Sequence, residues 1–426
     1  MGKRGYIMKL ITALKGTHDI LPEEVYKWQY IEEKIKNITE RYRYSEIRIP
    51  AFEYTELFAR GVGDTTDVVQ KEMYTFDDKG GRSLTLRPEG TAGVVRSFLE
   101  HGMFSDALPK KLYYMITCYR NEKPQAGSYR EFRQFGVEVF GAEDPSLDAE
   151  IISMAASLLS ELGLKNLVVN INSIGCPKCR KAYNDKLREY LRPHYDELCD
   201  TCKSRFEKNP LRILDCKSEI CRKIGENAPV LLDNICEECS EHFEKLKKEL
   251  EIFGINYVIN TSIVRGLDYY TKTVFEITSD SLGAQSTVCG GGRYDGLVEE
   301  LGGSPTPGIG FAMGLERLLM CMEAENVYMG EPSKADIYVA ALGENASDFV
   351  SGFVKKLRDE GVSAERDYMS RSLKAQMKYA NKIGARYSVV IGDNEIETGM
   401  ASLKNMETGE SEELTFDEMK DKLKNR

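Results

Sequence analysis

Three arginines are the residues of this sequence best suited to hold phosphate groups. Arg120 lies in CYRNE, Arg265 in VRGLDYY and Arg317 in MGLERLL, each within an otherwise apolar, aromatic or glycine-containing string. A guanidinium presents several N–H donors in one plane and binds phosphate oxygens in pairs. A bound nucleotide would need such groups, because the sequence has no GxxxxGK[ST] loop and no GxGxxG between a strand and a helix. A lone arginine is usually a solvated surface group, but the surroundings of these three argue against that explanation.

Carboxylates beside the same strand-like segments have the chemistry to recognise a base or a small cationic ligand. Glu122 follows Arg120 by two positions, and in an extended segment such residues face the same side. Gln134 and Glu138 share one face of the string FRQFGVEVF, and Glu89 lies in TLRPEGT. A carboxylate flanked by valine and phenylalanine is costly to bury unless it has a partner. The alternative is a sheet face exposed to solvent, and the local sequence leaves both open.

Strand patterns surround these residues in a first region of about 150 residues. Residues 22–41 are helix-like, and residues 44–49 (YSEIRI) form a strand-like string that ends at Pro50. Residues 111–119 and 132–140 have strand character and are joined by the loop NEKPQAGSYRE, which contains glycine and proline. Their pattern predicts a long antiparallel hairpin.

Three further regions differ in composition. Residues 174–251 contain most of the cysteines with many Lys and Glu residues, and they predict a helical insertion. Residues 255–325 return to strands and glycines and end in GIGFAMGLERLLMCM, a strand that runs into an apolar-faced helix. From Ala335 onward short strands alternate with helical segments, which predicts a separate small α/β domain after the linker GEPSK.

The composition is typical of a soluble multi-domain protein in a reducing compartment. The chain has 426 residues, 42% of them hydrophobic, and no run approaches the about 18 apolar residues of a membrane helix. The start lacks the continuous apolar block of a signal peptide, and translation begins at either Met1 or Met8. Eleven cysteines without a secretory signal favour the cytoplasm over a disulfide framework. The net charge of -10 argues against indiscriminate nucleic-acid binding but not against a specific RNA partner.

The ordered strings of the chain resemble those of histidyl-tRNA synthetases. Six carry the resemblance: KGTHDILP at 15–22, TLRPEGTA, YRNEKPQAGSYREFRQFGVEVFG, RGLDYYT at 265–271, GGGRYDGL and GIGFAMGLERL. Pro50, the hairpin and GIGFAMGLERL are similar to motifs 1, 2 and 3 of class II synthetases. The resemblance implies an α+β fold, with a class II antiparallel-sheet catalytic domain, a helical insertion and a mixed α/β anticodon-binding domain. It divides the chain into a catalytic domain at 1–173 and 254–330, an insertion at 174–253 and an anticodon-binding domain at 331–426.

The reaction that the resemblance implies is the charging of tRNA(His) with L-histidine by a histidine–tRNA ligase. ATP and histidine first give histidyl-adenylate and pyrophosphate, and the histidyl group then passes to the 3′ end of the tRNA. By resemblance, Arg120 holds the α-phosphate of ATP, Glu122 the adenine amino group and Arg317 the γ-phosphate. Arg265 offsets charge that develops at the α-phosphorus, so Arg265 and Arg120 are the expected catalytic residues. Mg2+ is expected to bridge the ATP phosphates.

The resemblance also implies a histidine pocket. Glu138 and Tyr270 hold the imidazole, with Tyr269 beside them. A carboxylate and a phenol together satisfy both ring nitrogens, which distinguishes histidine from an apolar side chain of the same shape. The residues expected around the amino end of histidine are Glu89, Gly90, Thr91 and Gln134.

Contacts to tRNA are expected at two places. In the motif 2 loop, Lys123 and Arg130 remain available for the acceptor end, although Ser128 stands where many relatives carry an arginine. In the C-terminal domain, four basic residues are spaced to lie along one helix face: Arg371, Lys374, Lys378 and Lys382. A solvated face is the ordinary explanation of such a stripe. The implied anticodon-binding domain makes phosphate contacts the expected role.

Cysteine pairs in the insertion have the spacing of zinc ligands. They are Cys176-x-x-Cys179, Cys199-x-x-Cys202 and Cys236-x-x-Cys239, with Cys216 and Cys221 between them. Any two pairs could form a tetrahedral site of four cysteines. The alternative is inert cysteines packed in helices, because the chemistry of the family needs no zinc. The sequence therefore predicts no catalytic metal or thiol and leaves a structural Zn2+ open.

Two other classes of protein share parts of this pattern. A non-catalytic regulatory subunit of ATP phosphoribosyltransferase has the catalytic-type fold but typically lacks RGLDYY-type residues and the C-terminal domain, both of which this chain has. An uncharged-tRNA sensor is normally part of a longer chain with a kinase. The sequence thus favours the ligase, and class II enzymes of this type are homodimers with the region near Pro50 at the interface.

Overall fold

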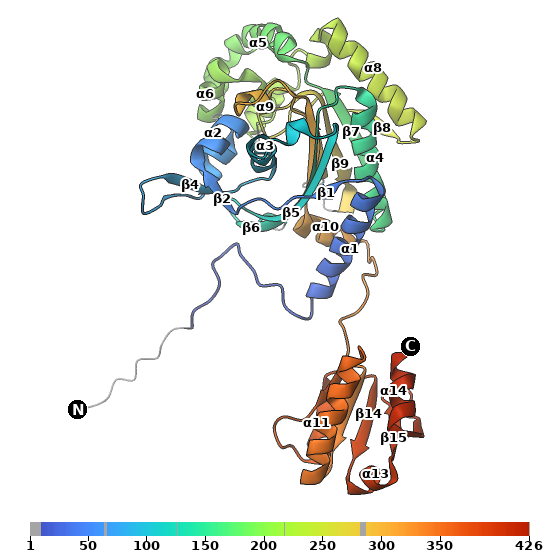
Figure 1. Cartoon of the computed structure of the whole chain (residues 1–426). Coiled ribbons are helices and arrows are strands. Elements are labelled where there is room, and N and C mark those ends of the chain that lie inside the picture. Colours follow the sequence, from blue (N-terminus) through green and yellow to red (C-terminus); the bar gives the residue numbers. More distant parts are fainter. Residues whose placement is uncertain (1–9, 64–65, 126, 217, 282–286, 426) are drawn as a thin grey trace, which may run out of the picture. The chain divides into compact units, whose positions relative to one another are not determined.

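The computed structural model describes residues 10–63, 66–125, 127–216, 218–281 and 287–425. The chain forms two compact units, Met1–Gly330 and Glu331–Arg426 (Figure 1). The alternative starts Met1 and Met8 lie outside the described residues. Among the helices that the structure describes, none combines the length and the apolar character needed to cross a membrane.

An eight-stranded sheet forms the centre of the first unit. In order across the sheet, its strands are β1 (Ser45–Glu46), β5 (Lys110–Tyr119), β6 (Glu131–Phe140), β11 (Gly308–Gly314), β10 (Thr287–Arg293), β9 (Thr271–Ser279), β7 (Leu167–Ser173) and β8 (Tyr257–Ile259). The pairs β1–β5 and β7–β8 at the two edges are parallel, and the other pairs are antiparallel. The predicted hairpin is confirmed as β5 and β6. The strand predicted at 44–49 is much shorter, because only Ser45 and Glu46 pair with β5.

Two apolar cores lie on the two faces of this sheet. The first contains Trp28 and Phe135 and is covered by α1 (Val25–Arg41), α4 (Pro145–Glu161), α8 (Glu237–Ile252) and α10 (Leu315–Ala324). In Figure 1, α1 and α4 lie along one side of the strands. The second contains Tyr114 and Phe98 and is covered by α3 (Thr91–Glu100) and α5 (Pro177–Leu191). Side chains alternate along β6, so Phe135 and Val137 enter the first core while Gln134 and Glu138 face the other side.

Smaller elements flank the main sheet. A three-stranded antiparallel sheet of β2 (Phe52–Tyr54), β4 (Ser83–Leu86) and β3 (Thr75–Asp77) follows Pro50. The other short elements are α2 (Thr55–Val62), the π-helix η1 (Val68–Glu72), the 3-10 helix η2 (Met103–Ser105) and α9 (Leu297–Glu300).

The cysteine-rich segment between β7 and β8 is helical. After α5 it contains η3 (Arg192–Glu197), α6 (Asp200–Lys208), η4 (Pro210–Ile213), α7 (Glu219–Gly225) and η5 (Leu231–Asn234), and it ends in α8. Prolines lie at the starts of η3 and η4, where the missing N–H of a proline removes no helical hydrogen bond. The segment therefore consists largely of short helices that rely on contacts with one another and with the catalytic sheet.

The second unit has its own five-stranded mixed sheet. Its order is β13 (Ala364–Arg366), β12 (Ile337–Ala341), β14 (Tyr387–Ile391), β15 (Met400–Asn405) and β16 (Ser411–Thr415). The first three strands are parallel, as the predicted βα alternation requires, and the last two pairs are antiparallel. Its helices are α11 (Glu344–Asp359), α12 (Leu373–Lys382), α13 (Asp393–Thr398) and α14 (Phe416–Lys424). The predicted α+β class, with a separate mixed α/β unit, is confirmed.

Candidate active site

A cavity of about 490 Å³ lies over β6, β10 and β11 of the eight-stranded sheet. All but one of the residues predicted to bind histidine or ATP line it: Glu89, Thr91, Arg120, Glu122, Gln134, Glu138, Arg265, Tyr269, Tyr270 and Arg317. The exception is Gly90, which precedes α3. Its Cα lies against the ring of Tyr114, where a Cβ would collide, so this position needs a residue without a side chain.

Glu138 is a buried acid in the cavity lining, and three hydroxyl groups surround its carboxyl group. Tyr294 Oη donates to its Oε2 at 2.5 Å, and Thr91 Oγ1 and Tyr114 Oη donate to its Oε1 at 2.7 and 3.1 Å. The residue is only 1% exposed, so the solvent-facing alternative for this strand is wrong. Burial raises the pKa of Glu138 to about 8, although the bonds from Tyr294 and Thr91 act in the opposite direction. The cavity therefore holds a carboxyl group that is largely protonated at neutral pH.

Glu89, the second buried acid of the lining, lies at the start of α3 and not on β6. It is buried beside α3 and accepts hydrogen bonds from the backbone N–H groups of Thr91 at 2.7 Å and Ala92 at 2.9 Å, so its carboxyl group satisfies two of the free N–H groups at the start of this helix. Burial raises its pKa, and these N–H bonds oppose the rise. Gln134 on β6 accepts a weak bond from the thiol of Cys118 at 3.7 Å. Glu89 and Gln134 thus both contribute polar groups to the lining of the cavity.

Arg265 is held in a conformation that L-residues rarely adopt. Its φ is 61°, which costs on the order of 1–2 kcal/mol outside glycine. Its guanidinium forms an ion pair with Glu276 on β9 and lies over the ring of Tyr270, 5.9 Å from the centroid. Burial acts to lower the pKa of Arg265, but Tyr270 and Glu276 outweigh this and the pKa is raised. The arginine therefore stays charged inside the cavity, beside Gly290, whose missing side chain leaves it room.

The other two arginines enter the cavity from different elements. Arg120 follows β5, donates through Nε to the carbonyl of Pro88 at 2.9 Å and lies over the ring of Phe132. Arg317 is in the first turn of α10 and donates through Nη1 to the carbonyl of Thr287 at 3.0 Å. Each guanidinium is oriented by a backbone carbonyl, and a guanidinium has five N–H donors, so both groups have the chemistry to bind phosphate as well.

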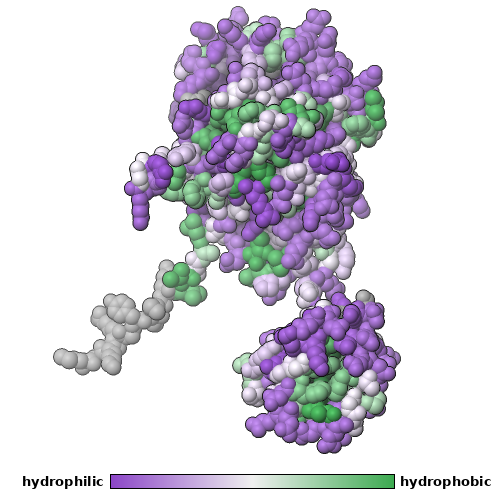
Figure 2. All heavy atoms as spheres, in the orientation of Figure 1, coloured by the Kyte–Doolittle hydropathy of each residue, from purple (hydrophilic) through white to green (hydrophobic). Residues whose placement is uncertain are grey.

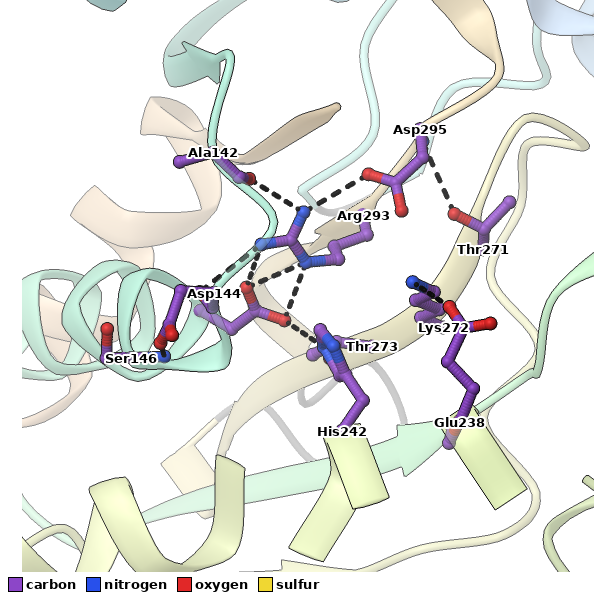
Figure 3. A network of polar contacts seen from close by, with 12 residues as sticks. Ala142, Asp144, Ser146, Glu238, His242, Thr271, Lys272, Thr273, Arg293 and Asp295 are labelled. Atoms are coloured by element: carbon purple, nitrogen blue, oxygen red, sulfur yellow. Dashed lines mark hydrogen bonds and ion pairs between the residues drawn. The ribbon is translucent and has the colours of Figure 1, made fainter. Parts of the chain in front are cut away.

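A buried ion pair supports the strands behind the cavity (Figure 3). Arg293, at the end of β10, pairs with Asp148 of α4 at 2.7 Å, and both side chains are 0% exposed. Arg293 also contacts Asp295 at 3.1 Å, and Asp148 contacts His242 of α8 at 2.9 Å. The N–H of Asp295 donates to Thr271 Oγ1 at 3.3 Å. The residues next in the chain to Arg293 and Thr271 line the cavity, so this network holds two of its walls.

The insertion contacts the loop that carries Arg265. Arg212 of η4 donates through Nη1 to the carbonyl of Arg265 at 2.7 Å and through Nη2 to the carbonyl of Gly266. Its Nε donates to Oδ1 of Asp268 at 2.9 Å, and Asn209 Nδ2 donates to the same oxygen at 3.0 Å. Arg212 does not line the cavity, so it positions the loop without facing the space for a substrate.

Eight cysteines of the insertion gather in two groups of four. One contains Cys176, Cys179, Cys236 and Cys239, and the other contains Cys199, Cys202, Cys216 and Cys221. The sequence left open which CxxC pairs would lie together, and in the structure Cys176 and Cys179 lie beside Cys236 and Cys239. Cys216 and Cys221, which lie between the CxxC pairs, complete the second group. Within the described part of the chain, no cysteine of the insertion lines the cavity.

The basic residues predicted to contact tRNA lie outside the cavity. Lys123 is exposed, and Arg130 donates to the carbonyls of Glu122 at 3.3 Å and Lys15 at 3.4 Å, while Ser128 lies at the cavity wall. In the second unit, Lys374, Lys378 and Lys382 are exposed on α12.

The prediction that Arg371 shares the face of this helix is wrong. The helix begins at Leu373, because Ser372 is its N-cap in extended conformation. Arg371 instead pairs with Asp367 at 2.9 Å and lies over the ring of Tyr379. Its guanidinium therefore stabilises the approach to the helix.

The sequence did not single out several residues that line the cavity or support its lining. Tyr294 and Tyr114 donate to Glu138, Glu276 pairs with Arg265, and Arg212 holds the loop. Tyr294 lies within the quoted string GGGRYDGL, which could have singled it out. No comparable sequence signal marks Arg212, which lies in an apolar stretch of the insertion.

Comparison with known proteins gives the same family across the chain. The model of the histidyl-tRNA synthetase family matches residues 16–199 and 203–318, and that of the anticodon binding domain matches 336–426. A histidine–tRNA ligase of Acetivibrio thermocellus is 63% identical over 415 residues, covering 97% of this chain and all of the relative. One of Caldanaerobacter subterraneus subsp. tengcongensis is 55% identical over 416 residues, covering 98% of this chain and all of the relative.

A solved structure agrees with these sequence relatives. The crystal structure of apo S. aureus histidyl-tRNA synthetase matches with a TM-score of 0.85 at 41% identity, covering 98% of this chain and all of that one. All of these comparisons cover both units of the chain. The chain therefore belongs to the histidyl-tRNA synthetase family, which consists of aminoacyl-tRNA ligases.

Proposed function

We propose that the cavity activates L-histidine with ATP to form histidyl-adenylate and that the enzyme then transfers histidine to the 3′ end of tRNA(His). ATP is a substrate of the ligases of this family. The observation that carries the proposal is that three arginines line the same cavity as Glu138, a buried acid that is hydrogen-bonded to hydroxyl groups. The guanidinium groups can bind the oxygens of a triphosphate, and a buried carboxyl group can hydrogen-bond to an imidazole nitrogen.

The imidazole of histidine would bind at Glu138 and Tyr270, beside Tyr269. Glu138 is protonated at neutral pH, so the bound pair of carboxyl and imidazole shares one proton and needs none from solvent. An apolar side chain of the same shape would offer Glu138 and Tyr270 no ring nitrogen to bond, which disfavours it. The amino end of histidine would face Glu89, Thr91 and Gln134, beside Gly90.

ATP would bind across the two walls that carry Arg120 and Arg317. Arg120 holds the α-phosphate, Arg317 the γ-phosphate, and Glu122 accepts from the adenine amino group. Arg265 donates to the oxygens at the α-phosphorus as the histidine carboxylate attacks and pyrophosphate leaves. Mg2+ would enter with ATP and offset the charge of its phosphates, which supply the oxygen ligands that this ion prefers. Zn2+ would have no part in this chemistry, because the described cysteines of the insertion lie outside the cavity.

The tRNA would contact both units. Lys123 and Arg130 are near the cavity on the loop between β5 and β6, where the acceptor end must arrive. Lys374 and Lys378 are exposed on α12 of the unit that matches the anticodon binding domain. Basic side chains at such positions bind the phosphate backbone and fix the register of the RNA. We place this reaction in the cytoplasm, in keeping with eleven cysteines that are all free thiols.

The enzyme would act as a homodimer through the small sheet that follows Pro50. Phe52 and Tyr54 are 53% and 56% exposed there, and Phe76 on the neighbouring strand is 44% exposed. On the face shown in Figure 2, the surface of the first unit is mostly hydrophilic with scattered apolar patches. Light scattering should give twice the chain mass of 48.2 kDa. Phe52→Glu should give monomers while Tyr328→Glu, which changes another exposed aromatic, should not; a wild-type monomer would refute the dimer.

The first test is ATP–pyrophosphate exchange with each of the twenty amino acids. Exchange with histidine alone, lost in Arg265→Ala while ATP still binds, is the expected result. Transfer of labelled histidine to tRNA(His) then tests the second step. A folded protein that binds ATP but exchanges no amino acid would refute the ligase and support the regulatory-subunit alternative. The curated relatives over the whole chain do not favour that alternative.

A further inference from the structure

We propose that each four-cysteine group of the insertion binds one Zn2+ ion. Cluster A is Cys176, Cys179, Cys236 and Cys239, and cluster B is Cys199, Cys202, Cys216 and Cys221. Within each cluster the four sulfur atoms all lie within 4.8 Å of one another. Four thiolates around one point are the ligand set of a structural zinc site.

The distances between the sulfur atoms fit a tetrahedral ion. Zn–S bonds of about 2.3 Å in a tetrahedron place the sulfurs about 3.8 Å apart. In cluster A, Cys176 Sγ lies 3.6 Å from Cys179 Sγ and 4.0 Å from Cys236 Sγ, and Cys179 Sγ lies 3.9 Å from Cys239 Sγ. In cluster B, the Sγ atoms of Cys199 and Cys216 are 3.8 Å apart. All of these distances are well beyond the about 2.05 Å of a disulfide bond.

The starts of three helices lie at the two clusters. Cys176 and Cys236 are the N-caps of α5 and α8, and Cys179 and Cys239 lie in the first turns of these helices. Two long helices thus direct their positive ends at cluster A. Cys199 likewise is the N-cap of α6 at cluster B, and Cys202 lies in its first turn. The partial positive charge of these helix starts offsets part of the negative charge of four thiolates around an ion.

Backbone N–H groups point at the sulfur atoms of both clusters. The N–H of Cys236 donates to Cys179 Sγ at 3.0 Å, and that of Cys199 donates to Cys221 Sγ at 3.4 Å. The N–H of Ser218 donates to Cys216 Sγ at 3.4 Å. Such bonds orient metal ligands and offset part of their negative charge.

The other cysteines of the chain show what isolated thiols do here. Cys118, Cys289 and Cys321 are buried singly in the catalytic unit, as small apolar side chains commonly are. The eight cysteines of the insertion instead meet in fours, across up to 63 positions of sequence between Cys176 and Cys239 (239 minus 176). Packing alone gives no reason for this grouping, whereas a metal ion does.

Both ions would brace segments of the active site without touching a substrate. At cluster A, Gly175 precedes Cys176, and its carbonyl accepts the N–H of Lys272 at 2.9 Å, two residues after Tyr270. At cluster B, Cys216 follows Arg212 by four positions, and Arg212 holds the backbone of Arg265. Zinc would therefore fix the insertion from which these contacts are made.

The test is the metal content of the full-length protein, purified under reducing conditions with a chelator wash. Mass spectrometry of the metals should find two Zn2+ per chain, and a mercurial reagent should release both. The double variants Cys176→Ser/Cys179→Ser and Cys199→Ser/Cys202→Ser should each retain one. Cys321→Ser, which changes a single buried thiol, should retain two. Cobalt-grown wild type should show the absorption of tetrahedral cobalt–thiolate sites, which supports the geometry even if the variants fail to fold.

Other outcomes would overturn the proposal. Less than one zinc per chain, with all eleven thiols titratable after denaturation, would show that the clusters are ordinary reduced thiols. Bound iron, or disulfides found by mass spectrometry of the intact chain, would assign the cysteines to a different chemistry. If the wild-type chain holds a single zinc, the cluster whose double variant still holds that zinc is not a zinc site. These measurements do not depend on catalysis, so they stand apart from the test of the ligase.

Discussion

Arg212 donates a hydrogen bond of 2.7 Å to the main-chain carbonyl of Arg265, from the insertion to the loop of the active site. Arg265 has a φ of 61°, and such strain persists only where neighbouring groups determine the conformation. Arg212 supplies three contacts of this kind, to the carbonyls of Arg265 and Gly266 and to the side chain of Asp268. The insertion can therefore set the position of the Arg265 guanidinium through the backbone of this loop.

Replacing Arg212 should impair the chemical step more than substrate binding. In Arg212→Lys, a single ammonium cannot reproduce the three contacts, so the loop should relax and move Arg265. We expect kcat for ATP–pyrophosphate exchange to fall about 10- to 100-fold, with a smaller change in KM for histidine. The matched control is Arg188→Lys, which removes bonds to the carbonyls of Phe206 and Glu207 within the insertion. Equal kcat values in the two variants would refute a positioning role for Arg212.

With the imidazole bound at Glu138 as proposed, the pKa of this carboxyl, raised to about 8, predicts how histidine binding depends on pH. Between pH about 6.5 and 8 free histidine has a neutral side chain and Glu138 carries a proton, so binding requires no proton exchange. Above pH 8 Glu138 loses its proton, and binding must take one up, so KM for histidine should rise up to about tenfold per pH unit. Below pH about 6.5 the imidazolium must release a proton at the protonated acid, and KM should rise again.

Glu138→Gln separates this effect from other titrations. The amide is always neutral, so the variant should bind histidine more weakly at pH about 7 but lose the rise in KM that begins near pH 8. Pyrophosphate exchange at a series of histidine concentrations and pH values measures both. If the variant keeps the same alkaline limb as the wild type, another group must be responsible for it.

The sequence predicted those parts of the site that depend on local geometry. Alternation along β6 placed Gln134 and Glu138 on one face, and the hairpin placed Arg120 at its end, because strand geometry is set by neighbours in the chain. The sequence did not decide whether Glu138 was buried. That depends on Tyr294, which is 156 positions away, and on Thr91, which is 47 positions away.

Contacts between distant segments account for the other differences. The CxxC spacing indicated metal-ligand chemistry, but which pairs meet depends on how α5 and α8 converge. The bond between Arg212 and Arg265 joins residues 53 positions apart, and no periodicity marks either partner. Arg371 has the sequence spacing of a residue on the α12 face, but it lies before the helix begins, because the N-cap of α12 is Ser372. Local patterns determined the elements, and tertiary packing determined their partners.

Gly290 provides a test of the space that Arg265 needs. A Cβ at this position would lie against the guanidinium of Arg265, the flexible end of a side chain, so the fold should adapt. Gly290→Ala should lower kcat for exchange by about tenfold or more, because in the proposed mechanism the displaced guanidinium would no longer face the α-phosphate. The melting temperature should change little. The control Gly296→Ala adds a Cβ in open space and should leave kcat intact, whereas an unchanged kcat in Gly290→Ala would show that this proximity is unimportant.

The buried pair of Arg293 and Asp148 should be a large contributor to the stability of the first unit. Both side chains are 0% exposed, and Asp148→Asn leaves the buried guanidinium with Asp295 as its remaining carboxylate partner among the described residues. Breaking such a pair costs about 3–5 kcal/mol, which should appear as a lower denaturation midpoint of this unit. The control Asp144→Asn removes an exposed ion pair with Lys245 at the start of the same helix and should cost no more than about 1 kcal/mol. Similar midpoints for the two variants would mean that the network of Figure 3 adds little to stability.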